Sequence, residues 1–196
     1  MRKENSMKLE FSVSNYIKQH NSVMNSLNIA ELESAIELIR DKAFSGKKIA
    51  VCGNGGSALA ASHYITDWNK MVHLDTGQRF NGVCLSDNVG LVTAYANDLS
   101  YEDVFSEQVK NLLFPNDLLI TVSGSGNSEN VVRATEVANS LGVSTLTITG
   151  YDGGRLKEIS KHSVWIDSFD MQICEDAHVV FGHLVMKGIC GLDVSV

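Results

Sequence analysis

The sequence predicts an α/β fold: a doubly wound, mainly parallel five-stranded sheet flanked by helices, with an N-terminal helical arm. From residue 47 onward, short apolar runs alternate with patterns of helical period. Two of these runs, 118–122 and 144–148, are almost continuously apolar or β-branched, which is typical of parallel strands covered on both faces. Glycine- and serine-rich turns follow two of the predicted strands, at the positions where doubly wound sheets bind ligands.

The arm is predicted over residues 8–45, as two amphipathic helices separated at Asn28 and ended by Gly46. Such an arm can pack against a partner subunit or cover the sheet of its own chain, and the pattern favours neither. The following strands are expected at 48–52, 82–86, 117–123, 144–149 and 163–167. Helices are expected between them at 58–71, 88–96, 102–113, 128–141 and 153–160, with a final helix at 172–191. No repeat or linker divides residues 1–196, so one domain is predicted, with its core over 46–196.

Composition narrows the function classes. The chain is 44% hydrophobic and 20% charged, with a net charge of −7, which argues against general nucleic-acid binding. Its first residues lack the apolar core of a signal peptide, and no stretch approaches the length of a membrane span, so a cytoplasmic protein without a membrane partner is expected. Four cysteines without CxxC spacing are predicted to be buried free thiols.

Residues 51–57, Val-Cys-Gly-Asn-Gly-Gly-Ser, form the first glycine-rich turn, between a buried strand and a helix. Backbone N–H groups at a helix start favour an oxyanion such as phosphate. Ser57 stands where either an N-cap or a phosphate-binding hydroxyl is expected.

Residues 123–128, Ser-Gly-Ser-Gly-Asn-Ser, form a second such turn, with Ser128 near the N-cap of the next helix. No lysine follows as in a nucleotide-binding P-loop, and no dinucleotide fingerprint is present. A flexible surface turn explains either segment alone. Two such turns at equivalent positions in one sheet favour a binding site for a small phosphorylated metabolite.

Two helices carry residues capable of chemistry. His63 and Asp67 are four apart and share a helix face, as do Glu175 and His183, which are eight apart. If the helices meet, two imidazoles and two carboxylates suit Zn²⁺ or proton transfer. A single histidine is nevertheless more often a structural residue than a ligand.

These motifs together resemble the sugar isomerase (SIS) domain family, in particular its phosphoheptose isomerases. The resemblance is carried by the turn at 53–57 followed by His63, by residues 123–131, and by residues 146–154. It implies a flavodoxin-like SIS fold and a homotetramer with active sites at subunit interfaces. It also implies the aldose–ketose isomerisation of sedoheptulose 7-phosphate to D-glycero-D-manno-heptose 7-phosphate, with a zinc ion in many members.

When the family's functional residues are matched to this chain position by position, the resemblance implies three groups of site residues. The catalytic residues are Asp67 and His183. The metal ligands are His63, Asp67, Glu175 and His183. The substrate-binding residues are Asn54, Gly55, Ser57, Asp98, Ser123, Ser125, Ser128 and Glu175.

The chain departs from the family pattern at four positions, two among these residues and two beside them. Asp67 replaces a glutamate, Glu175 a glutamine, Gly124 a threonine and Gln172 an aspartate. Asp67 is one methylene shorter than glutamate, although Asp67 and Glu175 both keep an oxygen donor. A phosphoheptose isomerase is therefore expected. The alternatives are an isomerase of another phosphosugar, a non-catalytic SIS domain that senses a sugar phosphate, and a tetrameric scaffold for a protein partner.

Overall fold

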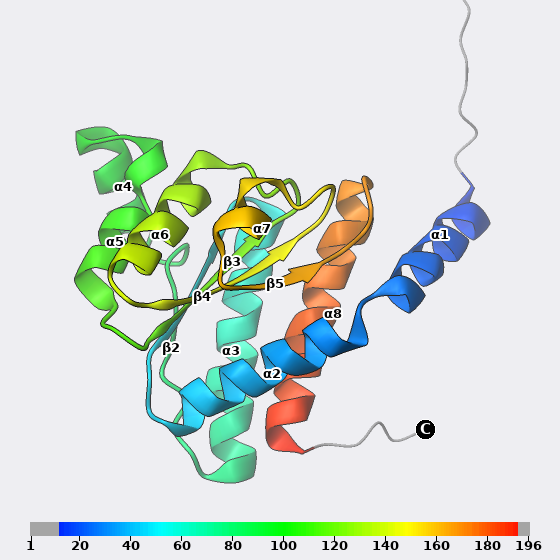
Figure 1. Cartoon of the computed structure of the whole chain (residues 1–196), viewed down its shortest axis with the longest axis horizontal. Coiled ribbons are helices and arrows are strands. Elements are labelled where there is room, and N and C mark those ends of the chain that lie inside the picture. Colours follow the sequence, from blue (N-terminus) through cyan, green and yellow to red (C-terminus); the bar gives the residue numbers. More distant parts are fainter. Residues whose placement is uncertain (1–11, 192–196) are drawn as a thin grey trace, which may run out of the picture.

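The fold was determined as a computed structural model, which describes residues 12–191 (Figure 1). Its five-stranded sheet has the order β2-β1-β3-β4-β5, and every pairing is parallel. The strands are β1 (Ile49–Gly53), β2 (Gly82–Cys84), β3 (Leu118–Ser123), β4 (Ser144–Thr149) and β5 (His162–Trp165). All five predicted strands are present, and the doubly wound α/β class is confirmed.

Both faces of the sheet are buried, and alternate residues of a strand serve different cores. In β1, Ile49 and Val51 join one apolar cluster, whereas Ala50 and Cys52 join the other. This period-two division explains why β1 and β3 contain no exposed residue and read as continuous apolar runs.

Helices cover both faces (Figure 1). One core contains residues of α2 (Ile29–Phe44), α3 (Gly56–Thr76) and α8 (Met171–Cys190). The other contains residues of α5 (Ser106–Leu112), α6 (Glu129–Ser140) and α7 (Gly154–Ile159). Two further helical segments, α4 (Val89–Asp98) and the 3₁₀ turn η1 (Tyr101–Asp103), lie between β2 and α5. The predicted helices are confirmed, except that the one expected at 102–113 divides into η1 and α5.

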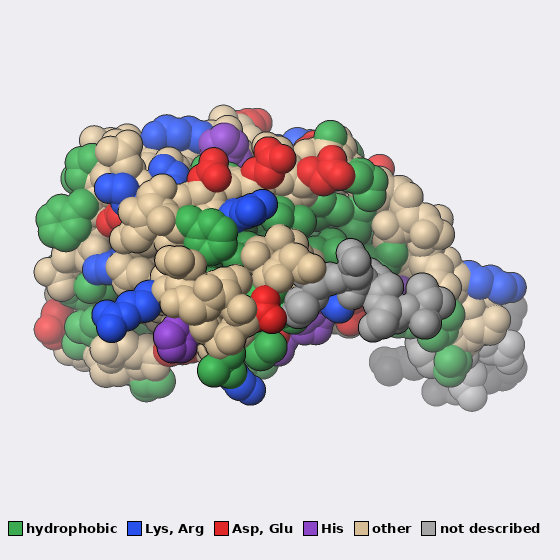
Figure 2. All heavy atoms as spheres, turned by 90° about the horizontal axis from the view of Figure 1, so that it is seen from below, with side chains coloured by type: hydrophobic (Ala, Val, Ile, Leu, Met, Phe, Trp, Pro, Cys, Tyr) green, Lys and Arg blue, Asp and Glu red, His purple; other side chains and the backbone are tan. Residues whose placement is uncertain are grey.

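The N-terminal arm behaves differently in its two halves. The second helix, α2, buries Leu32, Ala35, Ile39 and Ala43 and therefore covers the sheet of its own chain. The first, α1 (Val13–Ser26), has no buried residue and projects beside the main body (Figures 1 and 2). The part of the arm predicted over residues 8–11 lies outside the described residues.

Helices α3 and α8 pack extensively against each other and run in the same direction. Tyr64 donates a hydrogen bond to the backbone carbonyl of His178 at 2.5 Å, and Trp68 donates to that of Gly182 at 2.9 Å. A Cβ added to Gly182 would lie 2.4 Å from the Tyr64 ring, so only glycine permits this approach. These contacts fix which residues of the two helices stand opposite one another.

The four cysteines are free thiols, as predicted; Cys52, Cys84 and Cys174 are buried, as also predicted, whereas Cys190 is only partly buried. Burial raises the pKa of the Cys84 thiol to about 12 and that of the Cys52 thiol further still. Both are therefore protonated at neutral pH and unsuited to nucleophilic chemistry. Within residues 12–191, no helix has the length and apolar character needed to cross a bilayer.

Candidate active site

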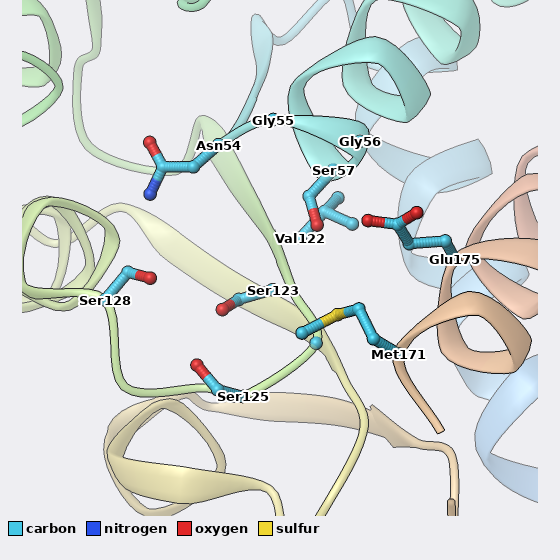
Figure 3. Close-up of a pocket in the computed structure, with 11 residues that line it drawn as sticks. Asn54, Gly55, Gly56, Ser57, Val122, Ser123, Ser125, Ser128, Met171 and Glu175 are labelled. Carbon is cyan, nitrogen blue, oxygen red and sulfur yellow. The ribbon is translucent and has the colours of Figure 1, made fainter. Parts of the chain in front are cut away.

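A cavity of about 260 Å³ opens at the carboxyl ends of β1 and β3, the point where the strand order reverses (Figure 3). The loop from β1 to α3 lines one side and the loop from β3 to α6 another, so the two glycine- and serine-rich turns meet in one pocket. The lining residues are Asn54, Gly55, Gly56, Ser57, Val122, Ser123, Gly124, Ser125, Ser128, Met171 and Glu175. Ligands of doubly wound sheets bind at this switch point.

The first turn presents backbone donors. Gly55 is the N-cap of α3, with a φ of 53°, and no side chain caps the helix. Ser57 is therefore the second residue of α3 and not its N-cap, which leaves the phosphate-binding alternative for its buried hydroxyl. Uncapped N–H groups at the positive end of a 21-residue helix favour an anion in the pocket.

The second turn adds hydroxyls on the opposite side of the pocket (Figure 3). Ser123 and Ser125 accept backbone hydrogen bonds from Gly126 and Asn127, at 3.1 and 3.3 Å, which shape the loop. Ser128 is the N-cap of α6, as predicted, yet its hydroxyl makes no capping hydrogen bond. The hydroxyls on this side of the pocket are neutral donors, and no lysine or arginine of the described chain lines the pocket.

Helix α8 closes the pocket with Met171 and Glu175. The Met171 sulfur occupies the space beside Gly124, since a Cβ there would lie 2.5 Å from Sδ. The Glu175 carboxylate lies against Gly56 in the same way and points toward the Ser57 side of the pocket (Figure 3). A hydroxyl-rich end and a carboxylate end thus face each other across one cavity.

A separate cluster lies further along the same two helices. His63 Nε2 is 2.9 Å from His183 Nε2, and Asp67 Oδ2 is 3.5 and 3.9 Å from these two atoms. The hydrogen bonds between α3 and α8 hold these side chains opposite one another. The shorter carboxylate of Asp67 therefore still reaches both imidazoles.

The histidine–aspartate cluster suits a divalent metal ion. Two ring nitrogens on one tetrahedral zinc, each at about 2.0–2.1 Å, lie about 3.3 Å apart, close to the observed separation of the His63 and His183 nitrogens. Asp67 supplies an oxygen beside them, and the ligand atoms of all three lie within 4.8 Å of one another. Two imidazoles and a carboxylate leave a coordination position open, as in catalytic zinc sites.

Two predicted site residues lie elsewhere. Glu175 belongs to the pocket and lies outside the cluster, because eight residues of helix separate it from His183, about 12 Å along the axis. Within one chain, three of the four predicted ligands come together: His63, Asp67 and His183. Asp98 ends α4, is exposed, and accepts a hydrogen bond from Asn97; it does not line the pocket.

Sequence reasoning did not single out three residues at the site. Met171 lines the pocket, and its only local signal was its place just before the last predicted helix. Asn130 and Tyr101 hydrogen-bond to Asn54 from segments 76 and 47 residues away. No spacing rule reports such contacts, because they depend on how the segments fold together.

His178 is the one fully buried imidazole near the site. It has no exposed surface, and neither ring nitrogen has a hydrogen-bond partner among residues 12–191. Burial lowers the pKa of this imidazole from 6.5 to about 4. The ring is therefore neutral in the folded protein and charged below about pH 6.5 in the unfolded chain.

We expect this difference to make the fold acid-sensitive. Below about pH 6.5 the unfolded state binds a proton that the folded state refuses, so stability is complete above that pH and falls between about 6.5 and 4. The loss amounts to about 3 kcal/mol at the acid end. His178→Leu should flatten this part of the pH profile in urea unfolding experiments at pH 4.5, 5.5 and 7.

His73→Leu, at an exposed position of α3, is the control and should keep the wild-type pH profile. A His178→Leu protein whose stability falls with acid as steeply as the wild type would contradict this explanation.

The fold and the site define a class of protein. The sequence matches the SIS domain family over residues 15–150, and the chain belongs to this family. Among curated relatives, it is 39% identical to the phosphoheptose isomerase of Helicobacter pylori strain HPAG1 over 138 residues, 70% of this chain and 71% of that protein. It is 36% identical to the phosphoheptose isomerase of Akkermansia muciniphila over 157 residues, 80% of this chain and 82% of the relative.

Solved structures agree with this assignment. The phosphoheptose isomerase of Neisseria gonorrhoeae superposes with a TM-score of 0.84 at 26% identity, covering 90% of this chain and 96% of that one. The phosphoheptose isomerase of Francisella tularensis gives a TM-score of 0.83 at 24% identity over 91% and 96% of the two chains, a likeness of fold.

Proposed function

We propose that this protein is a phosphoheptose isomerase that interconverts sedoheptulose 7-phosphate and D-glycero-D-manno-heptose 7-phosphate through an enediol. The observation that carries the proposal is the approach of His63, Asp67 and His183 on the helix pair that also bounds a pocket rich in serine hydroxyls. Curated relatives at 33–40% identity bear the name of this activity.

Substrate binding begins with the phosphate. In this proposal, Ser57, Ser123, Ser125 and Ser128 hydrogen-bond its oxygens, and the uncapped N–H groups of α3 add the favourable end of the helix dipole. The Glu175 carboxylate repels the phosphate from its own end of the pocket and accepts hydrogen bonds from sugar hydroxyls. The substrate is thereby oriented before any bond changes.

The isomerisation moves one proton between two carbons. Asp67 takes a proton from C1 of the ketose while the C2 carbonyl oxygen gains one from His183, and the enediol forms. The hydroxyl on C1 then returns a proton to His183, Asp67 delivers its proton to C2, and the aldehyde results. Acid–base groups placed in this way contribute about 10²- to 10⁴-fold in rate.

We propose that His63, Asp67 and His183 hold a zinc ion. When bound, zinc supplies a positive charge that stabilises enediolate oxygens. Nε2 of His183 can hold a metal ion or a proton but not both, so whenever the ion is bound its charge would replace the His183 proton at the carbonyl oxygen. Glu175 could join these ligands only from another subunit, because within one chain it lies too far along α8.

We propose a homotetramer, as the family resemblance implies, and the distance between pocket and cluster supports active sites at its subunit interfaces. Ser57 and Asp67 are ten residues apart on α3, about 15 Å along its axis. Near the cluster the surface is open and partly apolar: the His63 and His183 side chains are 41% and 47% exposed, and Leu59 is 74% exposed. A pocket from a neighbouring subunit placed there would complete the site.

The decisive experiment combines three measurements on purified protein: its metal content, its mass by light scattering, and its turnover of sedoheptulose 7-phosphate. We expect stoichiometric divalent metal, four chains per particle and heptose 7-phosphate as product. Hexose and pentose phosphates tested in parallel would identify an isomerase of another sugar. Tight binding of sugar phosphates without turnover of any of them would reject the enzyme and favour a sensor.

A further inference from the structure

Asn54 lies at the rim of the phosphate pocket, and its side-chain amide is held by two residues from distant segments. Asn130 Nδ2 donates to Asn54 Oδ1 at 2.9 Å, while Asn54 Nδ2 donates to Asn130 Oδ1 at 2.8 Å. The Tyr101 hydroxyl donates to the same Asn54 oxygen at 2.9 Å. Both lone pairs of that oxygen are thereby used.

A backbone N–H group determines which atom donates and which accepts in each of these hydrogen bonds. Val131 N–H can only donate, and it lies 2.9 Å from Asn130 Oδ1. The atom facing it must therefore be the oxygen of Asn130, which places the Asn130 nitrogen opposite Asn54 Oδ1. Asn130 is 2% exposed, so its amide has little freedom to turn over.

The turn that carries Tyr101 is also fixed, although Tyr101 itself is 55% exposed. It begins η1, and this turn is tied to α6 by Arg133, which pairs with Asp103 at 2.9 Å and with Glu102. Ser100 adds a hydrogen bond to Asp103 at 2.7 Å. One face of α6, through Asn130 and Arg133, thus fixes Asn54 and the turn that carries Tyr101.

We propose that Tyr101 and Asn130 are positioning residues that make Asn54 a pure hydrogen-bond donor toward the substrate. With its oxygen saturated and one N–H given to Asn130, Asn54 keeps a single N–H for a ligand. Figure 3 shows the nitrogen turned toward Ser128, across the pocket. This N–H therefore selects an acceptor, a phosphoryl oxygen, and rejects a hydroxyl presented as a donor.

This inference rests on the proposed substrate, and it is tested by kinetics and by binding. Tyr101→Phe removes one donor to the Asn54 oxygen and should raise the KM for sedoheptulose 7-phosphate about 2- to 10-fold, with kcat within about twofold of wild type. Asn130→Asp keeps both acceptor contacts but sets an oxygen against Asn54 Oδ1, and it should raise KM at least as much. The dissociation constants of sedoheptulose 7-phosphate and inorganic phosphate, measured by calorimetry, should rise in parallel.

The double variants separate positioning from general damage. If Tyr101 acts through Asn54, Tyr101→Phe should have no further effect on binding in an Asn54→Ala background, because coupled residues are not additive. Tyr16→Phe is the matched control: its hydroxyl makes a similar bond, 2.8 Å to Asp176, away from the pocket.

Additive losses from Tyr101→Phe and Asn54→Ala, or equal losses in the Tyr16→Phe control, would overturn the inference. A wild-type protein that binds phosphate but does not isomerise the sugar would refute the proposed function alone. The binding cycle would then still decide the role of Tyr101 and Asn130.

Discussion

Replacing Asp67 with asparagine is expected to lower the kcat for sedoheptulose 7-phosphate by about two to four orders of magnitude, with KM within about threefold of wild type. Asparagine is nearly the same size, so the packing beside His63 and His183 should survive. It cannot accept the C1 proton, however, and the step that forms the enediol loses its base. If the cluster holds the proposed metal ion, loss of the carboxylate should also reduce the divalent metal in the purified protein, because one of the three proposed ligands is weakened.

Steady-state kinetics and elemental analysis of the same preparations check this result. Asp75→Asn, on the same helix at an exposed position, is the matched control and should behave as wild type in both measurements. An Asp67→Asn enzyme with normal kcat would place the base elsewhere. Glu175, the carboxylate that lines the phosphate pocket, would then be the next position to change.

Mixing two inactive variants should restore activity. One variant carries Asp67→Asn, which disables the cluster, and the other carries Ser123→Ala and Ser125→Ala, which disable the pocket. If each active site takes its pocket from one subunit and its cluster from another, about a quarter of the sites in a randomly mixed tetramer contain both intact halves. Activity should therefore rise from near zero to about a quarter of wild type.

The experiment needs subunit exchange by joint refolding or coexpression, with each variant treated alone as the reference. A pair of variants that both disable the cluster, Asp67→Asn and His183→Ala, is the control and should stay inactive after mixing. If the first pair recovers no activity in particles shown by mass to contain both chains, the pocket and the cluster act within one subunit.

The sequence predicted the parts of the site that depend on local patterns. Ser57, Ser123 and Ser128 were found because glycine-rich turns between strand and helix carry a recognisable composition. His63 and Asp67 were paired because four residues bring side chains to one helix face. All five strands were predicted from apolar runs and turn residues. The predicted and observed helices differ mainly at their ends, and the helix predicted at 102–113 is divided at Val104 and Phe105.

Distances between helices could not be predicted in the same way. Glu175 shares a face of α8 with His183, so the pattern allowed both in one cluster. Which residues of α3 they face depends on how the two helices pack, and the structure sets Glu175 against Gly56 and His183 against His63. The position of Asp98 depends on where α4 lies relative to the sheet, which no local pattern encodes. The buried, unpartnered ring of His178 and the amide pair of Asn54 and Asn130 arise only when segments far apart in sequence meet.

The contact of Met171 with Gly124 makes the history of these two positions interdependent. The family pattern has a threonine where this chain has Gly124, but any side chain at 124 now meets the thioether of Met171. A lineage could regain that hydroxyl if residue 171 became smaller or if the Met171 thioether turned away. A substitution at 124 is therefore expected to be accompanied by a changed Met171 rotamer or by a smaller residue at 171.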